Sequence, residues 1–409
     1  MSLLERYEEV VGRYEIERLR RLGSRLAGKR IVHVNSTRQG GGVAEILGWM
    51  IPMMVELGID THWEVIQGNP DFYRVTKSFH NGLQGLPVNL RAADYKLHTD
   101  INEANARRLN LEADVVFVHD PQPIFLPRFT APGKVGRWVW RCHIDASRPD
   151  RMVWKHLSEG IADYEATIFS MASFTRPINR PMFLIPPSID PLAAKNSPMD
   201  DAERVAILER LGIDPERPML LQVSRFDRFK DPLGVIDAFR LVKPAHPELQ
   251  LVLVGGPADD DPEGAEVLAE VMERAGNDPD LHVLLLPSDS HREINALQRS
   301  AIIVLQKSLK EGFGLTVTEA LWKGKPVIGG ASGGIALQVH DYQTGFLVHS
   351  PAGAAYRIRY LLRYNDKRLR MGDVGHDFVR ENFLLTRHLR DYFSMLMWLD
   401  QPGSGVIAA

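Results

Sequence analysis

The feature that most constrains this fold is a regular alternation of short apolar runs with helix-length segments. The first run, RIVHVN, is rich in β-branched residues and is followed by glycines and a helix-like segment. Such runs are typical of buried parallel strands, and their alternation with helices predicts a parallel sheet covered on both faces. Strands are expected at residues 30–35, 61–66, 114–118, 136–142 and 166–170, and again at 219–224, 250–254, 282–286, 301–305 and 326–328.

A proline-dense segment at 176–198 divides this alternation into two series. Proline cannot sustain a helix interior or a central strand, so the segment is expected to be an interdomain linker. We expect an α/β protein with two Rossmann-like doubly wound domains, over 1–180 and 181–385, facing a central cleft. A C-terminal helix and tail over 386–409 would be able to pack back on the first domain. Because parallel sheets bind ligands beyond the carboxyl ends of their strands, the cleft is the expected site.

The net charge and the cysteine count exclude several classes of function. A net charge of −3 lacks the basic excess of a nucleic-acid-binding protein. The single cysteine, Cys142, excludes a disulfide within the chain and a cysteine-based zinc site, and the histidines show no metal-binding motif. We therefore expect neither a metal nor any other cofactor.

The first 28 residues are charged throughout and no apolar run is long enough to cross a bilayer, which predicts a cytoplasmic protein without a membrane partner. A homodimer is the expected assembly if the chain associates.

Two cations, Arg225 and Lys230, lie in the segment SRFDRFKDP, directly after the first expected strand of the second domain. Fixed cations at that position would stabilise the negative charge of a departing nucleoside diphosphate. A charge cluster of this kind is equally typical of a solvated polar loop, so the pattern alone leaves both interpretations open.

Two glutamates, Glu311 and Glu319, flank a glycine loop in the segment EGFGLTVTEALWKGKP. The glycines bring the backbone close to a ligand, and a helix is expected to begin at Thr316 or Thr318. Its N-terminus would favour an anion, while carboxylates accept hydrogen bonds from sugar hydroxyls. A second glycine loop at 329–338 offers further backbone amides.

The first domain also carries polar side chains at its expected strand ends. Gly41 and Gly42 belong to a three-glycine turn after the first strand, which is not a dinucleotide-binding fingerprint but allows a ligand close to the backbone. The segments HDPQP and RCHIDAS offer hydroxyl-binding groups in Asp120, Gln122, His143 and Asp145. A histidine in such a place is more often structural, and that alternative stays open.

The motifs S-R-x-x-x-x-K-D and E-G-F-G-x-x-x-x-E resemble the signature of the family 4 retaining glycosyltransferases, which have the GT-B fold. The resemblance implies that Arg225 and Lys230 hold the diphosphate, that Glu319 binds the ribose, and that Glu311 and His143 lie beside the donor sugar. The implied catalytic residues are Arg225, Lys230, Glu311 and His143. The implied nucleotide-binding residues are Ser224, Arg225, Lys230, Glu319, Leu315 and Thr316. The implied substrate-binding residues are Gly41, Gly42, Asp120, Gln122, His143, Asp145, Glu311, Gly312, Phe313 and Gly314.

Segments of the first domain narrow the resemblance. NSTRQGGGVAEIL, VHDPQP, WRCHIDAS and PPSIDP are similar to the trehalose glycosyltransferring synthases and to the related retaining trehalose phosphorylases. The family often has an acidic residue in its last glycine loop, where this chain has Gln338. The resemblance implies a reversible transfer from NDP-glucose to glucose that forms α,α-trehalose, so the expected partners are these small molecules alone.

Three other functions compete with this interpretation. A trehalose phosphorylase would use inorganic phosphate in place of the nucleoside diphosphate. An NDP-sugar epimerase would need a base at C2, for which the sequence shows no motif. A non-catalytic sugar-binding protein would have no use for Arg225 and Lys230.

Overall fold

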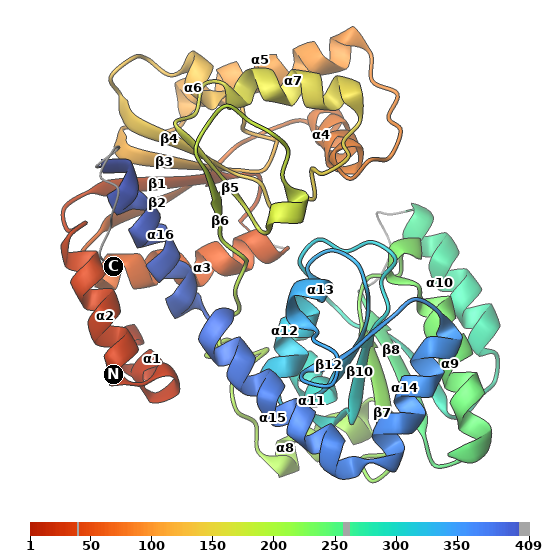
Figure 1. Ribbon diagram of the computed structural model, residues 1–409. Coiled ribbons are helices and arrows are strands. Elements are labelled where there is room, and N and C mark those ends of the chain that lie inside the picture. Colours follow the sequence, from red (N-terminus) through yellow and green to blue (C-terminus); the bar gives the residue numbers. More distant parts are fainter. Residues whose placement is uncertain (39–40, 257–261, 401–409) are drawn as a thin grey trace. The chain divides into compact units, whose positions relative to one another are not determined.

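The computed structural model describes residues 1–38, 41–256 and 262–400 (Figure 1). The chain forms two compact units: unit 1 combines Met1–Ser188 with the segment that starts at Leu385, and unit 2 is Ile189–Leu384. The units divide at Ser188, later than the expected division at 180/181, because unit 1 takes one more strand from the proline-dense segment. Residues 401–409, expected to form a tail, and Gln39 and Gly40 of the first glycine turn lie outside the described residues.

Unit 1 is built on a parallel sheet of six strands in the order β2-β1-β3-β4-β5-β6. Figure 1 shows α5 and α7 along one face of this sheet and α3 and α16 along the other. The strands are β1 (Arg30–Asn35), β2 (Asp60–Val65), β3 (Ala113–His119), β4 (Val135–Arg141), β5 (Ala166–Phe169) and β6 (Met182–Leu184). The helices are α1 (Leu3–Val11), α2 (Arg13–Ser24), α3 (Gly42–Glu56), α4 (Pro70–Leu83), α5 (Ala92–Arg108), α6 (Leu126–Phe129), α7 (Arg151–Ile161) and α16 (Leu385–Asp400), with a 3-10 turn at Ala172–Phe174.

Unit 2 is built on a second parallel sheet of six strands, in the order β12-β11-β10-β7-β8-β9. Its strands are β7 (Met219–Val223), β8 (Gln250–Gly255), β9 (Leu281–Leu285), β10 (Ile303–Gln306), β11 (Val327–Gly330) and β12 (Gly345–Val348). Its helices are α8 (Asp201–Arg210), α9 (Pro232–Val242), α10 (Pro262–Ala275), α11 (His291–Ser300), α12 (Leu315–Trp322), α13 (Ile335–Gln338), α14 (Pro351–Arg363) and α15 (Asn365–Asn382), with 3-10 turns at Arg228–Lys230 and Lys243–Ala245.

The strand orders fix where each sheet can receive a ligand. The order reverses between β1 and β3 in unit 1 and between β7 and β10 in unit 2. At such a switch point the crossovers leave to opposite sides, which opens a ligand position at the carboxyl ends of the two strands. The loops of Lys230 and Glu311, described below, follow the two strands at the switch point of unit 2.

The doubly wound α/β prediction is confirmed, but the number of strands expected from the sequence is too small. β6 has three residues inside the proline-dense segment, which is therefore not entirely a linker. β12 has four residues and begins at a glycine, so its composition resembles a loop. The amphipathic pattern over residues 3–27 predicts one helix, but the chain forms two helices there, α1 and α2, that meet at Gly12.

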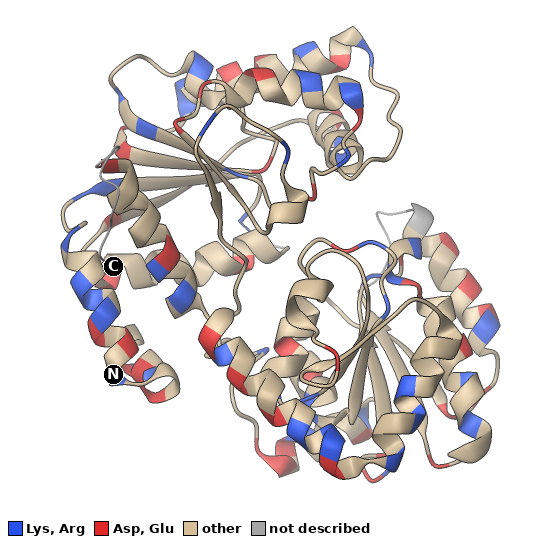
Figure 2. Ribbon diagram, in the orientation of Figure 1, with Lys and Arg blue, Asp and Glu red and all other residues tan. Residues whose placement is uncertain are grey.

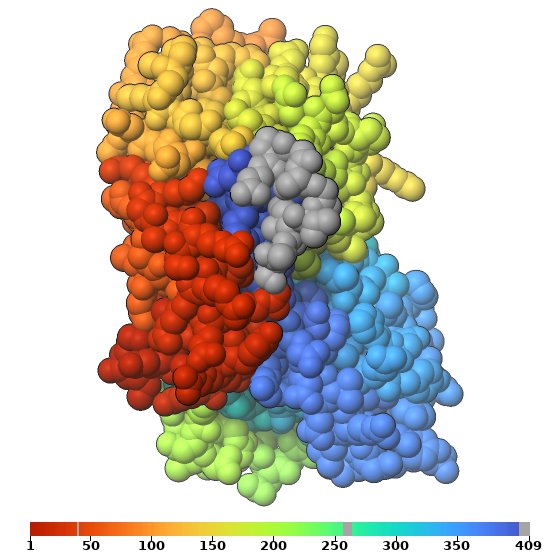
Figure 3. Space-filling model, turned by 60° about the vertical axis from the view of Figure 1, so that its left-hand side comes forward, coloured from red at the N-terminus to blue at the C-terminus, as the bar shows by residue number. Residues whose placement is uncertain are grey.

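The C-terminal helix α16 belongs to unit 1 and packs beside the N-terminal helices. Figures 1 and 3 show the last helix, in blue, against the red N-terminal segment. Arg390 of α16 forms an ion pair with Glu15 of α2 at 3.0 Å, and Lys29 pairs with Asp400 at 2.5 Å. These contacts join the two ends of the chain within one unit.

Charged residues lie mainly on the helices and loops. Figure 2 shows Lys and Arg interspersed with Asp and Glu on the helices of unit 2, and few charges on its strands. In the part of the chain that the structure describes, no helix is both long and apolar enough to cross a membrane.

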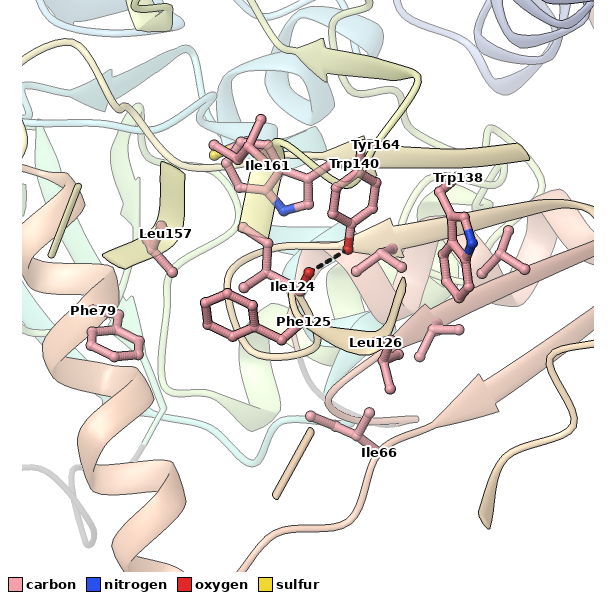
Figure 4. Close-up of a cluster of buried hydrophobic side chains, with 14 of the residues drawn as sticks. Ile66, Phe79, Ile124, Phe125, Leu126, Trp138, Trp140, Leu157, Ile161 and Tyr164 are labelled. Carbon is pink, nitrogen blue, oxygen red and sulfur yellow. Dashed lines mark hydrogen bonds between the residues drawn. The ribbon is translucent and has the colours of Figure 1, made fainter. Parts of the chain in front are cut away.

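The core of unit 1 lies between the sheet and helices α4, α5 and α7, and is rich in aromatic side chains (Figure 4). Tyr164 lies within it, and its hydroxyl donates a hydrogen bond of 2.8 Å to the backbone oxygen of Ile124. Tyrosine is favourable in a core only when its hydroxyl is paired in this way. The bond ties the segment that follows α7 to the loop between β3 and α6.

We expect Tyr164→Phe to lower the free energy of unfolding by about 1–2 kcal/mol, because the carbonyl of Ile124 loses its buried partner. The matched control is Tyr14→Phe, since Tyr14 is 73% exposed and should tolerate the loss of its hydroxyl. Urea unfolding of both variants measures the difference. Equal stability of the two variants would show that the buried hydrogen bond contributes nothing.

Candidate active site

The predicted diphosphate-binding loop and the predicted glutamate loop follow β7 and β10, the two strands at the switch point of unit 2. β7 and β10 pair in parallel, and the segments 224–231 and 307–314 leave their carboxyl ends. The sequence indicates that both segments follow strands, but it does not indicate that the two strands are neighbours. The structure shows that they are.

Lys230 and Glu311 form the centre of this site. The ammonium of Lys230 lies 2.7 Å from both carboxylate oxygens of Glu311. Their side chains are only 14% and 8% exposed, so water screens the pair weakly. Glu311 Oε2 also accepts hydrogen bonds from Gln306 Nε2 at 3.2 Å and from Ser308 Oγ at 3.0 Å. Three donors, the side chains of Lys230, Gln306 and Ser308, thus hold the carboxylate of Glu311 in place.

The backbone around Lys230 is fixed by neighbouring polar groups. The side chain of Asp227 accepts a hydrogen bond from the Lys230 N–H at 3.1 Å, and Gln222 Nε2 donates to the Lys230 oxygen at 2.8 Å. Asp231 then adopts φ 49° and caps α9 by accepting from Gly234 N–H at 3.1 Å. The turn and the helix cap together set the direction in which Lys230 leaves the chain.

Arg225 is placed differently from Lys230. Its side chain is 74% exposed, and its guanidinium pairs with Asp227 at 3.0 Å. Asp227 therefore connects Arg225 to the backbone of Lys230, and both cations belong to one ordered loop. Ser224 is partly buried and continues the β7–β8 ladder through its N–H, which donates to Val254 O at 3.0 Å.

A third cation, Lys307, was missed by the sequence argument. It follows β10 directly, is buried, and forms an ion pair with Asp231. Gln306 and Ser308, which hold Glu311, were missed as well. The available signal was their position at the end of an expected strand, the same criterion that selected Arg225 and Lys230.

Helix α12 begins at Leu315, one residue before the earlier of the two expected starts. Gly314 occupies its N-cap with φ 81°, a left-handed conformation that glycine adopts without strain. No side chain among the described residues caps the helix, so the amides of Leu315 and Thr316 remain suited to an anion. The nucleotide-binding roles of Leu315 and Thr316 stay predictions that rest on these backbone amides.

Glu319 lies in a separate network of hydrogen bonds from that of Glu311. It is buried within α12, and its carboxylate pairs with Lys195 at 3.3 Å and accepts from Gln298 Nε2 at 3.2 Å. Lys323, one turn later, is also buried, and burial lowers its pKa to about 7 against the opposing effect of Glu319. Lys195 and Gln298 are further neighbours that sequence spacing did not reveal.

The second glycine loop, over residues 329–338, is hydrogen-bonded to the glycine loop that follows Glu311. Gly334 N–H donates to the Gly312 oxygen at 2.7 Å, and the buried Gln338 donates to the Phe313 oxygen at 2.7 Å. Gln338 also accepts from Thr318 Oγ1 at 2.5 Å. The amide at position 338 thus has a structural role that a carboxylate, having no donor, could not fulfil in the same way. The side chain of Phe313 packs against Phe383, so only its backbone is placed for the predicted substrate-binding role.

In unit 1, the predicted residues after β3 and β4 are joined by hydrogen bonds. Asp120 has φ 64°, and its Oδ1 accepts from the backbone N–H of His143 at 2.8 Å. Burial raises the pKa of Asp120 to about 6. Trp140 Nε1 donates a hydrogen bond of 2.9 Å to the backbone oxygen of Asp120. His143 Nε2 lies 3.1 Å from Nδ1 of the buried His119. The structure therefore brings Asp120 and His143 together.

The other predicted residues of unit 1 have weaker connections to this group. Asp145 accepts from the N–H of Ser147 at 2.9 Å, which is a local turn. The backbone oxygen of Gln122 accepts from Asn102 Nδ2 at 2.9 Å. Gly41 has φ 82° and precedes α3, whose first residue is Gly42. Within the described ranges, no group of three or more His, Cys, Asp or Glu side chains is arranged to hold a metal ion.

Buried imidazoles make unit 1 sensitive to acid. Burial lowers the pKa of both His33 and His98 to about 3, whereas in the unfolded chain they would titrate near 6.5. The unfolded chain binds more protons between these values, so the free energy of unfolding falls as pH falls below 6.5. Each of the two contributes up to about 1.4 kcal/mol per pH unit. Asp120 has the opposite effect. Because its pKa is raised from 3.8 to about 6, its contribution to the free energy of unfolding increases as pH falls through this range.

We therefore expect the urea midpoint of unfolding to be lower at pH 5 than at pH 7.5. Replacing His98 by Phe should reduce this pH dependence, because it removes one of the buried groups. A midpoint that does not change between the two pH values would contradict the burial of these neutral rings.

Known proteins are similar to this chain over most of its length. The family model "Trehalose synthase, N-terminal domain" matches residues 33–176, and "Glycosyl transferases group 1" matches residues 203–377. The chain is 45% identical to a trehalose synthase of Thermococcus litoralis over 96% of both chains. It is 30% identical to a trehalose phosphorylase of Pleurotus pulmonarius, over 92% of this chain and 58% of that one.

Solved structures support the fold independently. A sucrose-phosphate synthase of Thermosynechococcus elongatus superposes with a TM-score of 0.71, at 16% identity, over 91% of this chain and 99% of that one. The two parallel sheets and this likeness identify the GT-B fold. Full-length similarity at 45% identity identifies the family. The chain therefore belongs to the trehalose synthase family and is a glycosyltransferase of the trehalose synthase type, with an activity in trehalose-related glycosyl transfer.

Proposed function

We propose that the chain is a retaining glucosyltransferase that forms α,α-trehalose from NDP-glucose and glucose, reversibly and without an obligatory metal. The observation that carries the proposal is the pairing of Lys230 with Glu311 at the switch point of unit 2, beside the loop of Arg225. A cation and a carboxylate placed together suit a donor with both a diphosphate and sugar hydroxyls.

In this proposal Lys230, Arg225 and the first amides of α12 bind the diphosphate of the donor. They stabilise the charge that grows on it as the bond to C1 of glucose breaks. Glu311 accepts hydrogen bonds from hydroxyls of the donor sugar, and Glu319 accepts them from the ribose. The carboxylate of Glu311 is already bound by Lys230, Gln306 and Ser308, which supports a binding role and weighs against its use as a nucleophile.

The acceptor is proposed to attack from the side of the leaving group. The bond between the acceptor oxygen and C1 forms as the bond from C1 to the phosphate oxygen breaks, and the acceptor proton passes to that phosphate oxygen. The anomeric configuration is then retained without a covalent enzyme intermediate. The protein contributes positioning and charge stabilisation. His143, Asp120, Gln122 and Asp145, with the backbone of Gly41 and Gly42, are proposed to contact sugar hydroxyls from unit 1.

A second candidate, a trehalose phosphorylase, is favoured by the relative from Pleurotus pulmonarius, which carries that name. Inorganic phosphate would then take the position of the diphosphate beside Lys230. This chain matches only 58% of that relative, whereas it matches 96% of the trehalose synthase of Thermococcus litoralis. This difference supports the transferase over the phosphorylase.

The forward reaction tests the proposal directly. The purified chain is incubated with glucose and, separately, ADP-, UDP- or GDP-glucose, and the product is identified by proton NMR. We expect α,α-trehalose with at least one donor, and equal activity in the presence of EDTA. A product with inverted configuration, or activity that is lost with EDTA and restored by a divalent ion, would contradict the proposal.

A further inference from the structure

Three histidines of unit 1 form a continuous array, and the proposed chemistry gives a role to only one of them, His143. His33 lies in β1, His119 ends β3, and His143 follows β4. His33 Nδ1 lies 3.1 Å from His119 Nε2, and His119 Nδ1 lies 3.1 Å from His143 Nε2. The planes of the His119 and His143 rings are inclined by 18°, and those of His33 and His119 by 32°. The array crosses the switch point of the sheet and ends at a residue proposed to contact sugar.

The three rings must orient their protons in one common direction. Burial lowers the pKa of all three imidazoles below 6.5, so each ring is neutral at pH 7 and carries one N–H. His119 contacts one neighbour through each nitrogen, so it donates to one and accepts from the other. The proton on His33 therefore determines the proton on His119, which determines the proton on His143.

The His33 end of the array determines in which direction the rings donate their protons. His33 Nε2 is buried and has no hydrogen-bond partner within the described residues. If His33 carried its proton there, a buried N–H would have no acceptor. A buried donor without a partner is rarer and less favourable than a buried acceptor without one. If the proton is on Nδ1, His33 donates to His119, and His119 donates from its own Nδ1 to His143 Nε2.

The outer end of the array is accessible. His143 is partly exposed, and its Nδ1 has no hydrogen bond to any described residue. The backbone N–H of His143 is anchored by Asp120 at 2.8 Å, which limits the positions the ring can reach. The open nitrogen is thus fixed in place and available to a ligand.

We propose that His33 and His119 are positioning residues that hold His143 in the tautomer with its proton on Nδ1. His143 then presents an N–H donor, which selects an oxygen that accepts, such as a sugar hydroxyl oxygen. The assignment of the sugar rests on the function proposed above, whereas the tautomer itself does not. The opposite tautomer would present a lone pair and would select a donor instead.

The tautomer can be observed directly in the full-length chain. The protein is labelled with ¹⁵N-histidine, and long-range ¹H–¹⁵N correlations show which ring nitrogen carries the proton; comparison with His143→Gln assigns the signals. We expect Nδ1 of His143 to be protonated and Nε2 to be bare at pH 7.5. A protonated Nε2 would overturn the proposal, whatever the activity of the chain.

A matched pair of variants tests the link to turnover. His119→Asn keeps an amide N–H close to the original Nδ1, so it can still donate to His143, whereas His119→Leu has a similar size and no donor. We expect His119→Leu to lose about tenfold or more in kcat/KM for the sugar donor and to shift the proton of His143 towards Nε2. We expect His119→Asn to retain the wild-type tautomer and most of the activity.

The outcomes separate the two proposals. Equal kinetics and an unchanged His143 tautomer in both variants would show that His119 only fills space and would overturn the positioning role. If His143 of the wild-type chain carries its proton on Nδ1 but the chain transfers no glucose, the positioning role is upheld and the proposed function is contradicted.

Discussion

Replacing Lys230 by alanine is expected to lower kcat/KM about a hundred- to a thousandfold, the range found when one fixed donor to a developing anion is removed. Lys230 is the cation that the structure holds at Glu311, and its turn is fixed by Asp227 and Gln222. Initial rates with the sugar donor measure the loss. The control is Lys96→Ala, which removes an exposed lysine paired with Asp100 on the surface of α5, and which should leave the rates unchanged.

The variant also leaves Glu311 with one partner fewer, and this second effect must be separated from the first. The double variant Lys230→Ala with Glu311→Gln removes the unpaired charge, so we expect it to regain stability towards urea. We do not expect it to regain turnover, because the diphosphate still lacks its cation. Recovery of turnover in the double variant would show that Lys230 serves only to neutralise Glu311.

Gly333→Ala is expected to be the most damaging change of a single methyl group near the site. Gly333 has φ 50°, and a Cβ there would overlap the backbone oxygen of Glu311 and lie 2.8 Å from the backbone oxygen of Gly312. Because both contacts are with backbone, the glutamate loop must move. We expect a loss of about 1–3 kcal/mol in the free energy of unfolding and a large fall in kcat/KM.

The control for this variant is Gly48→Ala, an exposed position within α3 where a Cβ meets nothing within 4 Å. Alanine there should be neutral or slightly stabilising, because it favours the helix. Urea unfolding and initial rates are measured for both variants. Wild-type rates in Gly333→Ala would show that the position of the glutamate loop does not matter for transfer.

The main features of the fold could be predicted from the sequence because buried parallel strands and their helices leave a strong apolar pattern. The segment 232–242, one of the helix-length segments between the expected strands, forms α9, since Asp231, Pro232 and the apolar face mark its start and course. β6 and β12 were missed because three or four residues beside proline or glycine carry no periodicity. The break between α1 and α2 was missed because one glycine within an amphipathic pattern is compatible with a continuous helix.

The candidate site was predictable where it rests on residues close in sequence, and not where it rests on pairing across the fold. The loops of Lys230 and Glu311 were identified from their positions after expected strands. Their direct contact depends on β7 and β10 being neighbours, which no local pattern encodes. The same holds for Lys307 with Asp231 and for the array from His33 to His143, whose members come from different strands.

The most direct test of the central claim is the cleavage of trehalose by the purified chain, in parallel with ADP, UDP or GDP and with inorganic phosphate. The account predicts that NDP-glucose and glucose form with at least one nucleoside diphosphate, and that phosphate alone yields no glucose 1-phosphate. Glucose 1-phosphate formed only with phosphate would contradict the account and would assign the site beside Lys230 to a phosphorylase.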